Sequence, residues 1–240
     1  MKSGQRGNLN QLGLLRFARN DKRNTKLLKA DFHIHTQYSR DCNMPLEKII
    51  NRCLKTKINC IAISDHGTVE GALKMQSLAP FKVIVAEEIL TPHGEIMGMF
   101  LKEGIPSGIS IEEAISRIKA QDALVCLPHP FDPFRGLRLD NHKIEELAEQ
   151  IDIIEVFNAR SPLSGPATKA QNFATKYDLP GIVGSDAHSP NEIGYTYVEM
   201  PEFDTKDDFL QALRQGKIST RKSSFLVHFS SAWAKLRNLP

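Results

Sequence analysis

The chain has 240 residues, 41% of them hydrophobic, and a formal net charge of +3. This length and hydrophobic content suit one large domain, or one domain with a small appendage. The small net charge gives no sign of the strong positive field of nucleic-acid or membrane-surface binders, although it would not repel a phosphorylated substrate. No apolar run reaches the roughly 20 residues of a membrane span, and the N-terminus lacks the apolar core of a secretory signal. We therefore expect a cytoplasmic protein without a membrane partner.

The cysteines show no paired C-x-x-C spacing, and two of them fall inside apolar runs. They are Cys42, Cys53, Cys60 and Cys126. This pattern indicates reduced thiols in an intracellular protein and argues against a structural disulfide framework.

Residues 1–26 are rich in Arg, Lys, Asn and Gln around one short apolar patch. We predict a flexible N-terminal arm here. Two alternatives stay open: an amphipathic piece that docks on the main domain, or residues upstream of the natural start.

A His-x-His pair lies in the first predicted strand, residues 30–35. Side chains alternate along a strand, so His33 and His35 should share one face, where two imidazoles can bind one metal ion. Asp41 follows on the next loop and could add a carboxylate to the same site. Two half-buried structural histidines would explain this pair equally well when it is considered alone.

Further along the chain, apolar runs typical of strands alternate with segments whose apolar residues repeat every three or four positions. The other predicted strands are residues 60–64, 83–89, 95–101, 124–127, 151–157 and 181–184. The predicted helices are residues 45–54, 69–78, 110–118, 143–149 and 166–177. This alternation predicts an α/β fold with a parallel sheet, most simply closed into a barrel.

Two of these helices carry more detailed predictions. Ser110 and Glu113 match a capping box at the start of the helix over residues 110–118. The helix after Pro45 should bury one stripe of apolar side chains. The predicted stripe is Leu46, Ile49, Ile50, Cys53 and Leu54.

Polar residues gather where the predicted strands end. Five of the eight histidines lie at strand ends, together with several acids: His33, His35, Asp65, His66, Glu88, His129, Asp186 and His188. Barrel enzymes collect their catalytic groups at the carboxyl ends of their strands. Five structural histidines at equivalent positions of different strands would be a poor alternative, so the pattern predicts a metal site at one end of a barrel.

The ordered motifs in this set resemble those of the PHP (polymerase and histidinol phosphatase) family. They are His33-Ile-His-Thr36 with Ser39 and Asp41, Asp65-His66, Pro128-His129-Pro130 and Ser185-Asp-Ala-His188. The resemblance covers about residues 31–188 and implies a distorted (β/α)7 barrel with two or three divalent metals that hydrolyses phosphate esters. The implied metal ligands are His33, His35, Asp41, His66, Glu88, His129, Asp186 and His188. Asp65 would support a ligand without touching the metal.

The sequence departs from the family pattern at two places. The usual Gly-x-Glu of the third strand is replaced by Ala86-Glu87-Glu88, and alternation lets only one glutamate face inward. We choose Glu88 and interpret Glu87 as an outward-facing or rim carboxylate. Glu95 stands where many relatives have a histidine, so it either replaces that ligand or leaves the third metal weak or missing.

The mixture of imidazoles and carboxylates suits Zn, Mn or Fe. Adjacent metals would lower the pKa of a bridging water, and the resulting hydroxide could attack phosphorus. The predicted catalytic residues are His66, His188 and Asp65, of which either histidine could protonate the leaving alkoxide unless it binds metal. Three arginines on predicted strand-end loops could hold a phosphate. They are Arg40, Arg135 and Arg160.

After the last motif the pattern changes. Residues 193–198 predict an edge strand, and Thr205 should cap a helix that buries Phe209, Leu210 and Leu213. We therefore divide the chain into the arm, a barrel over residues 27–194, and a C-terminal extension over residues 195–240 that packs on the barrel. Residues 229–239 could form a terminal amphipathic helix.

Three functions fit this sequence. The favoured one is a metal-dependent phosphoesterase acting on a small phosphorylated molecule or nucleotide. A 3'-5' exonuclease or oligonucleotide-directed phosphodiesterase has less support, because no basic tract is interleaved with aromatic residues. A non-catalytic metal-binding module is the third, and the nearly complete ligand set argues against it. The sequence predicts neither the substrate nor the oligomeric state.

Overall fold

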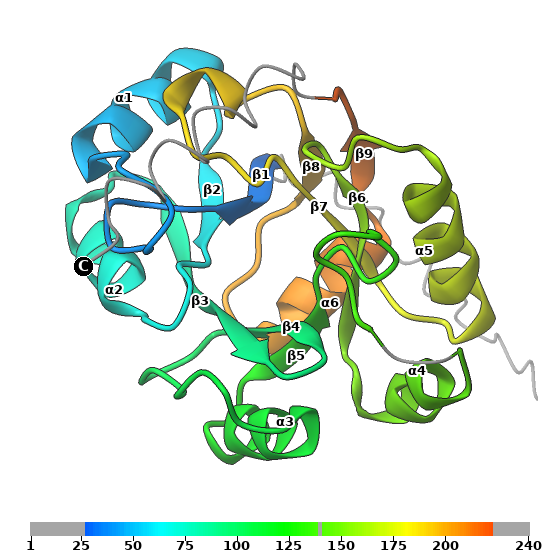
Figure 1. Cartoon of the computed structure of the whole chain (residues 1–240). Coiled ribbons are helices and arrows are strands. Elements are labelled where there is room, and N and C mark those ends of the chain that lie inside the picture. Colours follow the sequence, from blue (N-terminus) through cyan, green and yellow to red (C-terminus); the bar gives the residue numbers. More distant parts are fainter. Residues whose placement is uncertain (1–26, 139–140, 223–240) are drawn as a thin grey trace, which may run out of the picture.

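The computed structural model describes residues 27–138 and 141–222 (Figure 1). The predicted arm, residues 1–26, and the predicted terminal helix, residues 229–239, lie outside this range. Within it, no helix is long and apolar enough to cross a membrane. All four cysteines are buried, and no disulfide joins them.

The elements follow the predicted alternation closely. The strands are β1 (Leu27–Ile34), β2 (Cys60–Ile63), β3 (Lys82–Thr91), β4 (Gly94–Met99), β5 (Leu124–Leu127), β6 (Ile153–Asn158), β7 (Gly181–Gly184), β8 (Tyr197–Pro201) and β9 (Lys217–Ser219). The helices are α1 (Leu46–Thr56), α2 (Glu70–Leu78), α3 (Ile111–Ala120), α4 (Asn141–Leu147), α5 (Gly165–Lys176) and α6 (Lys206–Arg214), with short 3-10 turns η1 (Ala148–Gln150) and η2 (Pro190–Glu192).

The strands form one sheet in the order β7-β6-β5-β4-β3-β2-β1-β8-β9. The sheet curls until β1 and the end of β7 meet in a parallel bridge between Ile34 and Ala187. The main-chain N–H of His35 donates to the carbonyl of Ala187 at 3.0 Å across this junction. Helices α1 to α5 lie around the outside of the strands (Figure 1). The result is the predicted α/β fold with a nearly closed, distorted barrel.

Strand β4 is the exception to the predicted parallel sheet. It pairs antiparallel with both β3 and β5, whereas β1–β2, β2–β3, β5–β6 and β6–β7 are parallel. Thr91 and Gly94 pair directly at the turn between β3 and β4. A turn this short cannot carry the chain back to the other end of the sheet, so the two strands form a hairpin.

Helix α1 buries fewer side chains than the sequence predicts. Leu46, Ile49 and Cys53 are buried, Ile50 is half-buried, and Leu54 is 55% exposed. The prediction that Leu54 belongs to the stripe is wrong. Each residue of a helix is turned by about 100° from the last, so Ile50 and Leu54 point beside the narrow line that contacts the barrel.

The C-terminal elements continue the sheet of the barrel. Strand β8 pairs antiparallel with β1 on one side and with β9 on the other. The predicted edge strand over residues 193–198 is therefore wrong in two respects: β8 starts later, and β9 covers its outer side. Thr205 caps helix α6 and forms a capping box with Asp208, as predicted. Its buried Phe209 meets the ring of Phe32 on β1 at 5.4 Å, so this part of the chain packs on the barrel.

Candidate metal centre

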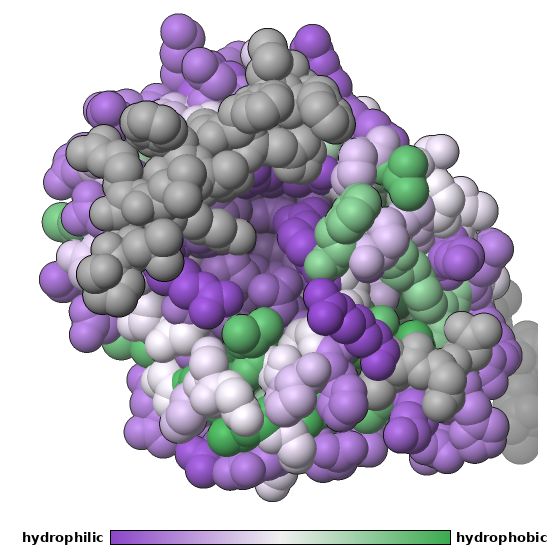
Figure 2. Space-filling view, viewed as in Figure 1, coloured by the Kyte–Doolittle hydropathy of each residue, from purple (hydrophilic) through white to green (hydrophobic). Residues whose placement is uncertain are grey.

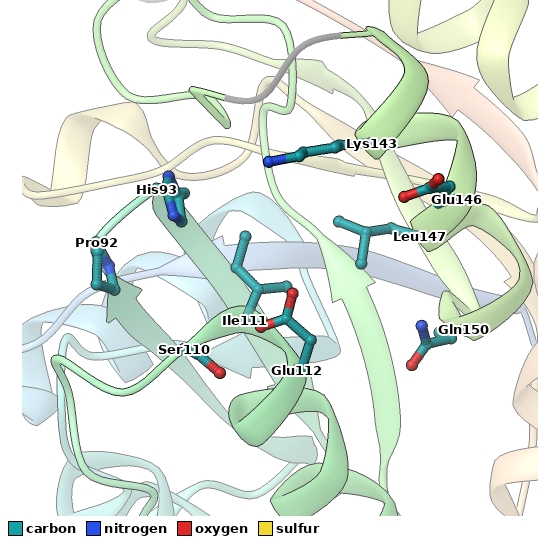
Figure 3. A pocket seen from close by; sticks show the side chains of 9 residues that line it. All are labelled: Pro92, His93, Ser110, Ile111, Glu112, Lys143, Glu146, Leu147 and Gln150. Carbon is teal, nitrogen blue, oxygen red and sulfur yellow. The ribbon is translucent and has the colours of Figure 1, made fainter.

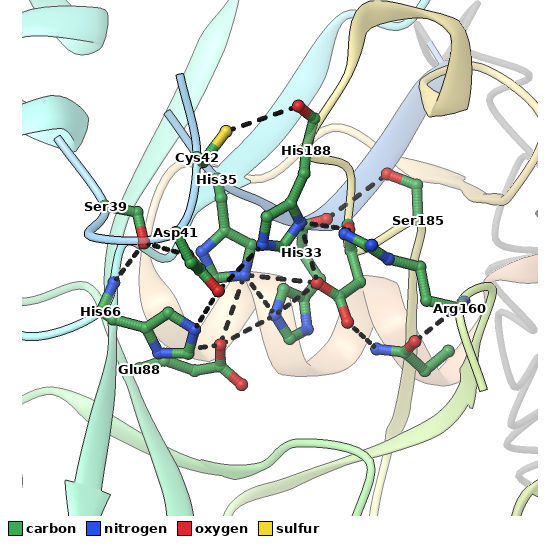
Figure 4. A network of polar contacts seen from close by, with 12 residues as sticks. His33, His35, Ser39, Asp41, Cys42, His66, Glu88, Arg160, Ser185 and His188 are labelled. Atoms are coloured by element: carbon green, nitrogen blue, oxygen red, sulfur yellow. Dashed lines mark hydrogen bonds and ion pairs between the residues drawn. The ribbon is translucent and has the colours of Figure 1, made fainter. Parts of the chain in front are cut away.

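The two histidines of the first motif meet at the end of β1. Their Nε2 atoms lie 3.1 Å apart, and both side chains are almost fully buried (Figure 4). His33 and His35 thus share one face, as alternation along a strand predicts. Two ring nitrogens this close, aimed at the same space, are arranged as a pair of metal ligands.

Glu88 on β3 reaches the same point. Its Oε2 lies 3.2 Å from Nε2 of His33 and 3.3 Å from Nε2 of His35. Its Oε1 lies 2.9 Å from Nε2 of His129, which follows β5. Glu88 is therefore the glutamate that faces the cluster, as chosen from the sequence.

Glu87 points to the opposite face of β3. Its Oε2 accepts the main-chain N–H of Ile105 at 2.8 Å, and the residue is fully buried. Of the two interpretations made from the sequence, the outward-facing carboxylate agrees with the structure, whereas the rim carboxylate is wrong because the loop before α3 covers Glu87. Burial raises the pKa of Glu87 to about 7.

Asp41 lies between two imidazoles. Its Oδ2 is 3.4 Å from Nε2 of His66 and 3.2 Å from Nε2 of His188. The hydroxyl of Ser39 donates to its other oxygen at 2.8 Å. Burial alone would raise the pKa of Asp41, but the hydrogen bonds of His188 and His66 hold it well below its usual range.

Asp186 closes the cluster from the end of β7. Its Oδ1 lies 3.4 Å from Nε2 of His35, and Arg135 forms an ion pair with its Oδ2. Asp186 and His129 both have positive φ angles, of 53° and 27°. Residues other than glycine rarely adopt this conformation, and such strain gathers at functional sites.

Glu95 lies near the start of β4. Because β4 runs antiparallel, its start is at the same end of the barrel as the ends of the parallel strands. Oε1 of Glu95 is 3.6 Å from Nδ1 of His66, and its Oε2 is 3.6 Å from Nε2 of His129. Burial and the neighbouring charge of Glu88 raise the pKa of Glu95. The structure thus places Glu95 within the cluster, where a ligand would be.

The donor set fits divalent cations. The described residues contain five overlapping groups of three possible ligands: His33–His35–Glu88, His35–Asp41–His66, His35–Asp186–His188, His66–Glu88–Glu95 and His33–His129–Glu155. The buried Nδ1 of His66 has no hydrogen-bond partner. Although burial alone would lower it, hydrogen bonds to Asp186 and Glu88 raise the pKa of His35 to about 10. Positive charge therefore stabilises the buried carboxylates, and bound cations would supply it.

Comparison with known proteins identifies the family. The sequence profile of the PHP domain matches residues 31–128, and that of a PHP-associated region matches residues 166–218. An uncharacterised protein of Methanocaldococcus jannaschii is 35% identical over 179 residues, which cover 73% of this chain and 71% of that protein. The chain belongs to the PHP family. A second uncharacterised protein of this organism is 38% identical over 145 residues, covering 55% of this PHP chain and 82% of that protein.

Solved structures share the fold of this PHP chain. One is a two-domain protein of Bacteroides vulgatus described as containing a predicted PHP-like metal-dependent phosphoesterase, with a TM-score of 0.63 and 21% identity. The match covers 89% of this chain but only 66% of that protein, just under two thirds of its length. PsfC of Pseudomonas syringae has a TM-score of 0.66 at 15% identity, covering 88% of this chain and 99% of PsfC.

The three arginines predicted to hold phosphate occupy different environments in this PHP chain. Arg135 contacts Asp186 and Asn158, and 32% of its side chain is exposed. Arg160 is buried and donates to the main-chain oxygen of Asp186 at 3.4 Å. Arg40 is exposed on the loop after β1. The structure brings Arg135 and Arg160 to Asp186, a candidate ligand, and only Arg135 of these two is also partly exposed.

Asp65 does not face the open centre of the cluster. Its carboxylate accepts the main-chain N–H and the hydroxyl of Thr36, both at 2.6 Å. It therefore fixes the loop that leaves β1 just after the two histidines. This arrangement suits support of the metal ligands rather than proton transfer.

Sequence reasoning missed two polar residues of β6. Glu155 and Asn158 are both buried, and their side chains contact each other at 3.2 Å. Oε1 of Glu155 is 3.1 Å from Nδ1 of His33. A glutamate inside an otherwise apolar strand is costly to bury without partners, and this was the signal that could have revealed it.

Two further histidines of the described residues, His93 and His142, lie away from the PHP site. His93 lines a separate pocket of about 340 Å³ between the β3–β4 turn, the start of α3 and helix α4 (Figure 3). None of the nine residues lining that pocket belongs to the ligand groups. His142 is 84% exposed and pairs with Glu146, and His228 lies outside the described residues.

Proposed function

We propose that this PHP chain is a metal-dependent phosphoesterase that acts on a small phosphorylated molecule. The observation that carries this proposal is a cluster of imidazoles and carboxylates at one end of the barrel with the partly exposed side chain of Arg135 beside it. The face of the molecule viewed along the barrel is hollowed and hydrophilic at its centre (Figure 2). A small anion could enter this hollow.

The cluster would hold two or three divalent ions, of which Zn, Mn and Fe suit the donor set. Such ions supply neutralisation of phosphate charge and a nucleophilic water near neutral pH. The residues that would hold them are His33, His35, Asp41, His66, Glu88, Glu95, His129, Asp186 and His188.

Arg135 is the best placed residue to bind a phosphoryl oxygen. Its Nη1 pairs with Asp186 and its Nη2 donates to Oδ1 of Asn158 at 3.2 Å, which fixes the orientation of the guanidinium. The planar fork of arginine matches phosphate oxygens with paired hydrogen bonds. A phosphate held by Arg135 would therefore lie against the ligands of the cluster.

His188 suits metal binding better than donation of a proton to the leaving group. Burial, together with the nearby His35, lowers the pKa of His188 to about 4, so the ring is neutral at physiological pH. Its Nδ1 lies 2.9 Å from the main-chain oxygen of Asp186 and must carry the ring proton, so Nε2, which lies 3.2 Å from Oδ2 of Asp41, presents its lone pair on the side of this second candidate ligand. His66, the other histidine suggested as an acid, is 10% exposed but belongs to two of the possible ligand groups, so metal binding competes for its ring nitrogens.

A substrate panel tests the proposal. The purified protein would be assayed with Mn, Zn or Mg on phosphomonoesters, phosphodiesters, nucleotides and short oligonucleotides, with phosphate or nucleotide release as the readout. We expect metal-dependent hydrolysis of a small ester by the wild type and none by His35→Ala, which controls for contaminating phosphatases. Hydrolysis of oligonucleotides alone would favour the exonuclease instead. Equal activity of the variant, or no activity with any metal, would reject the proposal.

A further inference from the structure

Glu155 lies directly behind the histidine pair. It is almost fully buried, and its Oε1 is 3.1 Å from Nδ1 of His33, the ring nitrogen that faces away from the cluster. Its Oε2 accepts the main-chain N–H of His129 at 2.8 Å. One carboxylate thus contacts two candidate ligands, the side chain of His33 and the main chain of His129.

Asn158 joins this carboxylate to the opposite side of the cluster. Its Nδ2 lies 3.2 Å from the oxygens of Glu155 and 3.2 Å from Oδ2 of Asp186. Its Oδ1 accepts from Arg135 at 3.2 Å. Glu155 and Asn158 therefore form a continuous polar layer under the ligands.

An irregularity of β6 makes this layer possible. In a regular strand, residues 155 and 158 would point to opposite faces. The pairing of β6 with β7 shifts register between Glu155 and Phe157, so that one extra residue is accommodated there. Such bulges redirect side chains and are common beside active sites. Here the bulge lets Glu155 and Asn158 face the same cluster.

The neighbouring strand leaves room for the contact between His33 and Glu155. A Cβ atom at Gly184 of β7 would collide with the Cβ of His33 and would lie 2.6 Å from Oε1 of Glu155. The chain therefore has no side chain at the point where this imidazole and this carboxylate meet.

We propose that Glu155 is a positioning residue that keeps the proton of His33 on Nδ1 and so presents the lone pair of Nε2 to the metal. Both oxygens of Glu155 accept hydrogen bonds, from the main-chain N–H of His129 and from Nδ2 of Asn158, so the carboxylate acts as an acceptor and the Nδ1 beside it as the donor. Nε2 then faces His35 and Glu88 as an acceptor, the form in which imidazole binds metal. The inference rests on the proposed use of this cluster as a metal centre.

The test compares wild type with Glu155→Gln, which keeps the size of the side chain but removes its charge. Zinc affinity would be measured by competition with a chromophoric chelator. Carboxylates that support a metal-bound histidine typically contribute about 10–100-fold to metal affinity, and we expect a loss in this range. Glu149→Gln, an exposed change just before the same strand, is the matched control and should bind zinc like wild type.

A second readout follows the proton itself. In zinc-loaded protein with ¹⁵N-labelled histidine, the ring of His33 should show a proton on Nδ1 and zinc on Nε2, and this Nδ1–H signal should shift or exchange faster in Glu155→Gln. If Glu155→Gln does not fold, Glu155→Asp keeps the charge at a shorter reach and should show a smaller effect in the same direction.

Unchanged zinc affinity in the folded variants would overturn the proposal, as would zinc bound to Nδ1 of His33 in wild type or a wild type that binds no zinc. Neither readout uses a substrate. A protein that binds zinc as expected but hydrolyses no phosphate ester would therefore reject the proposed function while leaving the role of Glu155 intact.

Discussion

Glu87→Gln should make the protein more stable at alkaline pH. Glu87 is fully buried, and its pKa is raised by burial from 4.5 to about 7. Between these two values the folded protein keeps a proton that the unfolded chain has already released. The stabilising effect is thus fully present below pH 4.5 and is lost as the pH rises through 7. This difference in pKa corresponds to about 3 kcal/mol of unfolding free energy, roughly a tenfold change in the folding equilibrium per pH unit.

Glutamine cannot ionise, but its carbonyl can still accept the N–H of Ile105. The unfolding free energy of Glu87→Gln minus that of wild type should therefore rise by about 3 kcal/mol between pH 4 and pH 8 and then level off. Denaturant titrations across this pH range measure the difference in unfolding free energy. Both proteins are first stripped of metal by a chelator. Glu103→Gln, an exposed change nearby, should show a flat difference. A flat difference for Glu87→Gln as well would mean that Glu87 is ionised in the folded protein, and the reasoning would fail.

Three further tests concern the site and the packing. Glu95→Gln keeps the side-chain shape but removes a charge, so the metal-to-protein ratio after dialysis should fall below that of wild type; an unchanged ratio would exclude Glu95 as a ligand. Gly184→Ala inserts a methyl group against His33, so thermal unfolding should show that the unfolding free energy falls by about 1–3 kcal/mol; an unchanged unfolding free energy would mean that β7 shifts to make room. Ile49→Ala should cost about 2–5 kcal/mol, whereas the exposed Leu54→Ala should change stability by less than about 0.5 kcal/mol in urea titrations; similar costs would contradict the packing of α1.

The sequence was most informative where chemistry and strand ends coincide. A short apolar run that stops at Asp65-His66 or at His129 predicts both a strand and the polar side chains at its end. Parallel strands of a barrel then bring their ends together wherever they occur in the chain. For this reason the candidate ligands could be predicted from the sequence alone, and the structure gathers them in one cluster.

Other features depend on information that local patterns do not carry. A bulge in β6 lets Glu155 and Asn158 face the same cluster, whereas regular alternation would point their side chains to opposite faces. The exposure of Leu54 depends on how narrow a contact α1 makes with the barrel. The direction of β4, in contrast, was open to prediction, because residues 90–94 are too few to cross to the other end of a sheet.

The junction between β1 and β7 is a place where the barrel should open locally. The N–H groups of His35 and Ala187 donate across it at 3.0 and 3.4 Å, and the N–H of Ser185 donates to the carboxylate of Asp31 at 2.9 Å. By comparison, β2 and β3 pair over four successive residues. Amide hydrogens at the junction should therefore exchange with deuterated water sooner than those of β2. His35 and Asp186 approach the cluster from opposite sides of the junction, so a cation bound to both would hold β1 and β7 together. Slower amide exchange at the junction would therefore report a bound cation, and the measurement needs no substrate.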